Sequence, residues 1–179
     1  MEREVKLVYS DAEAARRSIE SIGGRLVVSR RLLDDRLFDT PEQSLRQAGS
    51  ALRVRRDGQK AILTFKGAAE RGPVKSRPEI ETTVGDADKA EAIVGGLGFR
   101  RWFRAQKFRA EYACGQATVC VDETPIGVFV EIEAPTIAEI DRIAGLLGKS
   151  RVDYRLESYP ALYMSWCAAR NIAPGDMVF

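Results

Sequence analysis

Charged and apolar residues alternate along most of the short extended stretches of this 179-residue chain. In residues 2–9, for example, Glu2, Glu4 and Lys6 alternate with apolar residues such as Val5. Successive side chains of a β-strand point to opposite faces, so this alternation predicts strands with one apolar and one charged face. The same parity places further ionisable residues together on single faces: Arg53 and Arg55; Lys66; Arg77, Glu79 and Glu81; Lys107 and Arg109; Asp122; Glu131 and Glu133.

A Glu-x-Glu spacing occurs three times, at residues 2–4, 79–81 and 131–133. Two glutamates on one strand face lie about 7 Å apart, and they repel each other unless a cation lies between them. Arginines and lysines fill the corresponding positions of other predicted strands. Carboxylates beside such bases suit hard divalent metal ions and a polyphosphate. A barrel with this face inward would enclose a charged tunnel; an ordinary sheet with its charged face in water is the alternative.

Helix signals separate these strands. A capping-box pattern at residues 10–13 opens a first helix, and further helices are predicted to begin at Asp86, Thr136 and Ser158. Strands with one apolar face need cover on that face, which the helices supply. The predicted fold class is therefore α+β: a single-domain antiparallel closed β-barrel of about eight strands, with a charged tunnel inside and helices packed outside.

One domain is predicted for residues 1–170, followed by a frayed C-terminal tail at residues 171–179. No apolar run reaches the roughly 18 residues of a membrane span, and the N-terminus lacks the apolar segment of a signal peptide. We therefore expect a cytoplasmic protein without a membrane partner. The formal net charge of +2 argues against double-stranded nucleic acid as a partner.

Histidine is absent from the chain, which excludes histidine-based catalytic triads, general bases and zinc sites. The three cysteines, Cys114, Cys120 and Cys167, cannot all pair and are too scattered for a zinc or disulfide framework. The chemistry that remains open depends on carboxylates, lysine, arginine or a cysteine.

The Glu-x-Glu-x-Lys pattern of residues 2–6 resembles the motif that opens the CYTH proteins, also called triphosphate tunnel metalloenzymes. Further blocks resemble the family in the same order: Phe38-Asp39-Thr40, Leu45, Gly49 and residues 51–55; 63–67; 77–81; 107–109; 122–133; and Ser158-Tyr159-x-x-Leu162. The resemblance extends to about residue 163 and is nearest to the class IV adenylate cyclase and small prokaryotic triphosphatase branch. Leu37 and Tyr163 depart from the family pattern at packing positions. The C-terminal region also lacks a lysine that some family triphosphatases have, which weighs against thiamine triphosphatase in particular.

The resemblance implies a tunnel that binds a linear triphosphate together with Mg²⁺ or Mn²⁺. It assigns substrate binding to Lys6, Arg53, Arg55, Lys66, Arg77, Lys107 and Arg109. It assigns metal binding to Glu2, Glu4, Asp122, Glu131 and Glu133. Lys6, Arg55, Lys66 and Glu133 are the candidate catalytic residues. The pair Glu79 and Glu81 stays open between metal binding and orientation of the basic side chains.

Three functions remain open at this level. In a triphosphatase, a metal-activated water attacks the terminal phosphorus and releases phosphate. In a class IV-type adenylate cyclase, the ribose 3′-hydroxyl of ATP attacks the α-phosphorus, giving cyclic AMP and pyrophosphate. Hydrolysis demands less of the site and is the preferred hypothesis. A non-catalytic nucleotide- or polyphosphate-binding module is disfavoured, because the carboxylates would weaken its hold on a polyanion. The substrate stays open among ATP, tripolyphosphate and thiamine triphosphate, and a homodimer stays open as well.

Overall fold

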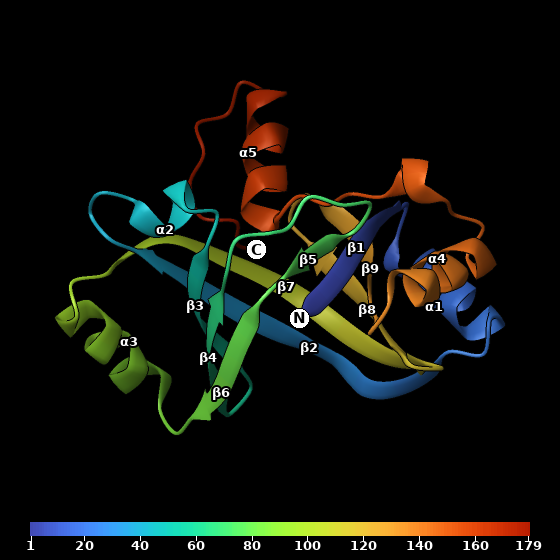
Figure 1. Ribbon diagram of the computed structural model, residues 1–179, viewed down its shortest axis with the longest axis horizontal. Helices are drawn as coiled ribbons and strands as arrows, with labels where there is room; N and C mark the ends of the chain where they lie inside the picture. Colours follow the sequence, from blue (N-terminus) through green and yellow to red (C-terminus); the bar gives the residue numbers. More distant parts are fainter.

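The computed structural model describes residues 1–179, and its centre is one antiparallel sheet of nine strands (Figure 1). The strands are β1 (Glu2–Tyr9), β2 (Arg25–Asp39), β3 (Ala51–Asp57), β4 (Lys60–Lys66), β5 (Lys75–Arg77), β6 (Glu79–Val84), β7 (Arg100–Cys114), β8 (Ala117–Thr124) and β9 (Gly127–Glu133). The helices are α1 (Ala12–Ser21), α2 (Ser44–Gln47), α3 (Ala87–Gly96), α4 (Ile137–Leu146) and α5 (Tyr159–Ala168), with a 3-10 turn at Arg151–Asp153. The order of the strands in the sheet is β5-β1-β9-β8-β7-β2-β3-β4-β6.

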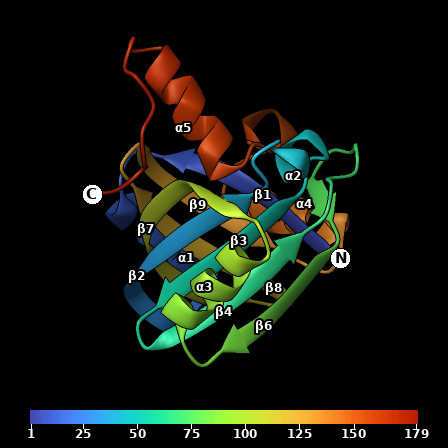
Figure 2. The ribbon, with the colours of Figure 1, turned by 90° about the vertical axis from the view of Figure 1, so that its left-hand side faces the viewer.

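A proline joins the two edges of this sheet. The edge strands β5 and β6 are consecutive in the chain and are separated only by Pro78. Strand β5 pairs with β1 and β6 pairs with β4, so the sheet curls into a nearly closed barrel (Figure 2). Proline has no N–H for the ladder, and it interrupts the strand at this point. The predicted α+β barrel is confirmed, with nine strands rather than about eight because Pro78 divides one of them.

Helices cover the outer, apolar face of the barrel. Helices α1 and α4 pack over β1, β8 and β9, where Ile19 and Ile140 belong to the same buried cluster as Val5, Val119 and Ile132. Helix α3 packs over β3 and β4. The outward apolar residues of the alternating pattern thus form the core, and their charged neighbours are left facing inward.

The capping signals place the helix starts correctly, with one shift at the first helix. Asp86, Thr136 and Ser158 are the N-caps of α3, α4 and α5. The cap of α1 is Asp11 rather than Ser10: its carboxylate accepts a hydrogen bond from the Ala14 amide at 2.7 Å. A carboxylate satisfies the free N–H groups of the first turn and also interacts favourably with the helix dipole.

The C-terminal residues differ from the predicted frayed tail. Met177 is only 1% exposed, its N–H donates to the Arg104 carbonyl at 2.9 Å, and its carbonyl accepts from the Gln106 amide at 2.8 Å. The Asp176 carboxylate accepts a hydrogen bond from Arg101 at 2.8 Å. These bonds attach the chain end to β7, beside α5 (Figure 1). None of the helices has the length and apolar character that a membrane crossing requires.

Candidate functional site

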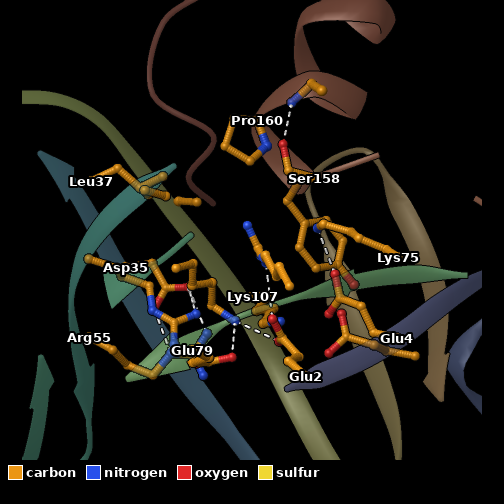
Figure 3. A pocket seen from close by; sticks show the side chains of 18 of the residues that line it. Glu2, Glu4, Asp35, Leu37, Arg55, Lys75, Glu79, Lys107, Ser158 and Pro160 are labelled. Atoms are coloured by element: carbon orange, nitrogen blue, oxygen red, sulfur yellow. Dashed lines mark hydrogen bonds and ion pairs between the residues drawn. The ribbon is translucent and has the colours of Figure 1, made fainter. Parts of the chain in front are cut away.

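A cavity of about 750 Å³ lies inside the barrel, and its wall carries both acidic and basic side chains (Figure 3). The lining includes every candidate site residue except Asp122: Glu2, Glu4, Lys6, Arg53, Arg55, Lys66, Arg77, Glu79, Glu81, Lys107, Arg109, Glu131 and Glu133. These residues come from seven strands, so the closure of the sheet is what brings them together.

Strand register decides which charged residues face each other. On β1, the apolar Val5 and Leu7 are fully buried on the outside, so Glu4 and Lys6 point inward. Strand β9 runs antiparallel beside β1, with Glu133 opposite Glu4 and Glu131 opposite Lys6. The first and last Glu-x-Glu pairs of the chain are therefore neighbours in space.

On the β2–β3 side of the cavity, Arg55 is held by a carboxylate. Its Nε and Nη2 donate to the two oxygens of Asp35 at 2.6 and 2.8 Å, the two-pronged geometry that orients a guanidinium firmly. Burial alone would raise the pKa of Asp35, but the positive charges of Arg55 and Arg53 hold it below its ordinary value. Asp35 stays ionised and fixes the direction in which Arg55 points.

The adjacent Arg53 is less well satisfied. Its Nη2 donates to the Thr64 hydroxyl at 3.1 Å, and its contacts to Glu81 and Asp35 are longer, at 3.5 and 3.7 Å. Its Nε is buried without a hydrogen-bond partner. Burial and the neighbouring charge of Arg55 lower the pKa of Arg53, as expected for a cation that is short of counter-charge. An anion in the cavity would supply that charge.

Asp122, which the resemblance assigns to the metal set, lies behind the cavity wall and is fully buried. It accepts hydrogen bonds from Lys107 Nζ at 2.8 Å, from Arg109 Nε and Nη2 at 2.6 Å, and from the Tyr159 hydroxyl. Burial alone would raise the pKa of Asp122, but Arg109 and Lys107 lower it. Because these donors occupy its oxygens, Asp122 orients the Lys107 ammonium and the Arg109 guanidinium and does not face the cavity.

Lys6 connects the two acidic strands. Its Nζ lies 2.9 Å from Glu4 and 3.3 Å from Glu131, and the side chain is almost completely buried. Burial alone would lower the pKa of Lys6, but the two carboxylates raise it above its ordinary value. Lys75 donates to the same Glu4 carboxylate at 2.7 Å, so Glu4 lies between two ammonium groups.

A second group of ion pairs spans the junction between the sheet edges. Lys66 Nζ donates to Glu2 at 2.6 Å and to Glu79 at 2.7 Å, and Arg77 Nε donates to Glu2 at 3.0 Å. These contacts join β1, β4, β5 and β6 across the point where Pro78 interrupts the barrel.

Glu133 has no basic partner. Partial burial and the carboxylates of Glu2, Glu131 and Glu4 raise the pKa of Glu133 to about 7. A carboxyl group with a raised pKa, beside other carboxylates and without a basic partner, is a place where a bound cation would be stabilised.

The carboxylates around Glu133 fit a hard divalent ion that takes most of its ligands from phosphate and water. The structure brings no three Asp, Glu, Cys or His side chains close enough together to form a metal cage. Mg²⁺ characteristically binds one or two protein carboxylates and completes its six ligands with phosphate oxygens and water. Glu133, with Glu131 or Glu2 beside it, suits an ion that arrives with a phosphate-bearing substrate.

Sequence reasoning missed three residues that shape the site: Asp35, Lys75 and Tyr159 in its hydrogen-bonding role. Lys75 precedes Arg77 by two positions, so the same strand parity extended backwards would have found it. Asp35 lies between the apolar Leu33 and Leu37 at alternate positions of one strand. That signal was available. Nothing in the sequence signals that Tyr159 contacts Asp122.

The chain belongs to the CYTH domain family, whose model matches residues 1–152. It is 29% identical over 171 residues to the adenylate cyclase CyaB of Aeromonas hydrophila, covering 90% of this chain and 87% of that protein. It is 25% identical over 134 residues to a protein of Methanocaldococcus jannaschii described as a candidate adenylate cyclase, covering 74% and 76% of the two chains.

Solved structures share the fold. A protein from Pyrococcus horikoshii OT3 superposes with a TM-score of 0.77 at 25% identity, covering 90% of this chain and 99% of that one. A candidate adenylyl cyclase from Hippeastrum, described as having a dominant triphosphatase activity, superposes with a TM-score of 0.68 at 22% identity, covering 92% and 96%.

Proposed function

We propose that this protein is a divalent-metal-dependent enzyme that acts on a linear triphosphate inside the barrel and releases phosphate by hydrolysis. The observation that carries the proposal is the division of charge in one cavity. Well-oriented arginines and lysines lie on the β3 and β7 wall, and a carboxylate cluster that is one cation short lies on the β1 and β9 wall. A triphosphate with its metal ion supplies both missing charges.

The basic residues bind the phosphate groups of the substrate. Arg55 and Arg109 are held in direction by Asp35 and Asp122, so their remaining N–H groups are pre-oriented toward the cavity. Arg53 has unsatisfied hydrogen-bonding capacity. Arginine forks match phosphate oxygens in geometry, and fixed donors of this kind stabilise developing charge without having to reorganise during the reaction.

The carboxylates provide the metal-binding side, with Glu133 as its central ligand and Glu131 or Glu2 beside it. A divalent ion bound there supplies charge neutralisation on phosphate oxygens and a water of lowered pKa. Phosphoryl transfer depends mainly on positioning and electrostatics, so a site without histidine is chemically sufficient. Lys6 and Lys66 hold the carboxylates in place and offer ammonium groups to phosphate oxygens.

Cyclisation of ATP to cyclic AMP is the second candidate, because the relative from Aeromonas hydrophila is named an adenylate cyclase. In both reactions the same basic residues bind the triphosphate and the same metal ion is used. They differ in the nucleophile: a water at the terminal phosphorus or the ribose 3′-hydroxyl at the α-phosphorus.

One experiment separates these functions. The purified protein is incubated with ATP, inorganic tripolyphosphate and thiamine triphosphate, each with Mg²⁺ or Mn²⁺, and phosphate, pyrophosphate and cyclic AMP are resolved by chromatography. Release of orthophosphate supports the hydrolase. Equal amounts of cyclic AMP and pyrophosphate from ATP would replace it with the cyclase. No turnover of any triphosphate, together with measurable binding, would leave a binding module.

A further inference from the structure

On two strands of the barrel, the row of basic residues that lines the cavity is followed by a carboxylate. On β3, Asp57 lies two residues after Arg55, and on β7, Glu111 lies two residues after Arg109. Side chains two residues apart on a strand share a face. Both strands run antiparallel to β2, which lies between them, so they run in the same direction. The charge along both rows therefore changes from positive to negative toward the same end of the barrel.

The burial of neighbouring residues shows that these two carboxylates face the barrel interior. Ala110 and Tyr112, on either side of Glu111, belong to the buried cluster on the outside of the barrel. Val54, three residues before Asp57, belongs to the buried cluster under α3. Neither carboxylate lines the cavity, so both lie in the interior beyond the last basic residues of its wall.

One arginine of β2 joins the two carboxylates. Arg31 Nε donates to Asp57 at 2.7 Å and Arg31 Nη2 donates to Glu111 at 2.5 Å, and we call these three residues the Arg31 bridge. The backbones of Asp57 and Glu111 pair with different β2 residues, Leu33 and Val28, so the Arg31 side chain is what connects the two rows. The bridge carries one more negative than positive charge, and Arg31 Nη1 is buried without a hydrogen-bond partner.

The opposite ends of the same two rows carry no charge. The inward residues before the basic pairs are Ala51 on β3 and Ala105 on β7, and both line the cavity. A phosphate chain on this wall therefore meets neutral side chains in one direction and excess negative charge in the other. Asp57 and Glu111 are largely buried, so solvent screens their repulsion of a phosphate less than it would at the surface.

We infer that the Arg31 bridge is an electrostatic stop that sets how far a phosphate chain extends into the barrel. The terminal phosphate binds beside Arg55 and Arg109, and the two carboxylates beyond them repel any further phosphate. The stop thereby fixes which phosphorus of the chain lies at the position of attack. This inference rests on the proposed function and assigns the residues that determine its register on the substrate.

A binding test removes the negative charge of the stop and keeps its shape. In Asp57→Asn/Glu111→Gln, amide oxygens still accept from Arg31, but the bridge becomes positive. Tripolyphosphate and tetrapolyphosphate are titrated calorimetrically in EDTA at low ionic strength, where turnover is not expected. The wild type should bind both chains within about twofold, whereas the variant should bind tetrapolyphosphate about tenfold more tightly, because Arg31 can then hold the fourth phosphate. The same ratio of Kd values in both proteins, or no binding of either chain by the variant, would overturn the inference.

The matched control is Asp34→Asn/Glu91→Gln, which makes the same change in net charge outside the cavity. Asp34 binds Arg104 and Glu91 binds Arg36, and neither carboxylate lines the cavity. This control should keep the wild-type ratio of Kd values, and a shift equal to that of the test variant would overturn the inference. Circular dichroism checks the fold of both proteins. If the double variant does not fold, Asp57→Asn alone makes the bridge neutral and should give about a threefold preference for tetrapolyphosphate.

The first products from tetrapolyphosphate in Mg²⁺ give a second, independent readout. With the stop intact, water attacks the terminal phosphorus and the products are orthophosphate and tripolyphosphate. A chain that lies one phosphate deeper is cleaved at its central bond, so the variant should form two pyrophosphates from each chain. Identical first products from both proteins would overturn the inference.

These outcomes also distinguish the inference from the proposed function. If the wild type hydrolyses no triphosphate or tetraphosphate, the proposed enzymatic function fails, and the calorimetric titration still decides whether the Arg31 bridge limits the bound chain. If the wild type hydrolyses tripolyphosphate and the variant keeps the wild-type binding ratio and products, the enzymatic function stands and the stop is rejected.

Discussion

The two charged walls of the cavity are built from the same alternating pattern and reach opposite states. On the basic wall, Arg55 and Arg109 are each bound by a carboxylate, Asp35 and Asp122 respectively, and are held rigidly. On the acidic wall, Glu133 has no cationic partner, and partial desolvation together with the adjacent carboxylates raises its pKa to about 7. The arginines of the basic wall are already paired and oriented, whereas Glu133 on the acidic wall has no counter-charge.

Under the proposed function, this difference corresponds to the charges that a triphosphate and its metal ion would supply. Orienting the basic groups in advance lets them stabilise charge without reorganising, so an anionic substrate meets fixed donors. An incomplete acidic wall creates a demand for a cation at one place in the cavity. The predictions that follow test this contrast, beginning with the largest effect.

Removal of divalent metal is expected to abolish turnover completely, because the acidic wall then lacks the charge that Glu133 requires. The measurement is phosphate release from the best triphosphate substrate in EDTA, followed by addition of excess Mg²⁺ or Mn²⁺. Activity should fall to the buffer background and return with either ion. Undiminished turnover by metal-free protein would show that the reaction does not require a metal ion on the acidic wall.

Glu133→Gln is expected to lower kcat about 100-fold with a smaller change in KM, because it removes a charge needed as the transition state develops and keeps the side-chain shape. Steady-state kinetics across a range of Mg²⁺ concentrations make the measurement, and a weaker dependence on Mg²⁺ should accompany the loss. Glu42→Gln, at an exposed position outside the cavity, is the control and should match the wild type. Identical kcat values in the two variants would contradict the metal-side role of Glu133.

Arg55→Ala is expected to raise KM at least about tenfold and to destabilise the fold by about 3 kcal/mol. It removes a phosphate donor and leaves the Asp35 carboxylate unpaired. Chemical denaturation and kinetics on the same preparation measure the two effects.

The double variant Asp35→Ala/Arg55→Ala separates them. Removing the orphaned carboxylate should recover much of the stability and none of the substrate affinity. Recovery of both would show that Arg55 supports the fold and has no contact with substrate.

Acidification is expected to lower the stability of the fold by a smaller amount, through Asp35 on the basic wall. Arg55 and Arg53 hold the pKa of Asp35 below its ordinary value of 3.8, so Asp35 contributes stability above that pH and loses it as the pH falls further. In Asp35→Asn this contribution is absent at every pH. The drop in Tm between about pH 5 and pH 3 should therefore be about 4 °C smaller than in the wild type. Parallel curves of Tm against pH for the two proteins would show that Asp35 does not cause the loss of stability in acid.

The alternating pattern predicted which side chains share the charged face of each strand, because strand parity is a local property, and the family resemblance added the closed barrel that brings these faces together. Glu4 and Lys6 face inward because Val5 and Leu7 are buried on the other side. The same local logic reaches Lys75 when it is extended by two residues. It failed at the C-terminus, where Pro174 and Gly175 indicate a loose tail but Met177 is buried through backbone bonds to β7.

The sequence by itself determined which residues carry charge and on which strand face, and therefore the chemistry available inside the barrel. Tertiary structure decided which of those charges are satisfied. Asp122 and Glu133 both belong to an alternating acidic face, yet one is buried under four donors and the other has no basic partner. That difference depends on neighbours contributed by distant strands and by α5. Electrostatic energy depends on distance in space and on burial, and neither can be read from spacing along the chain.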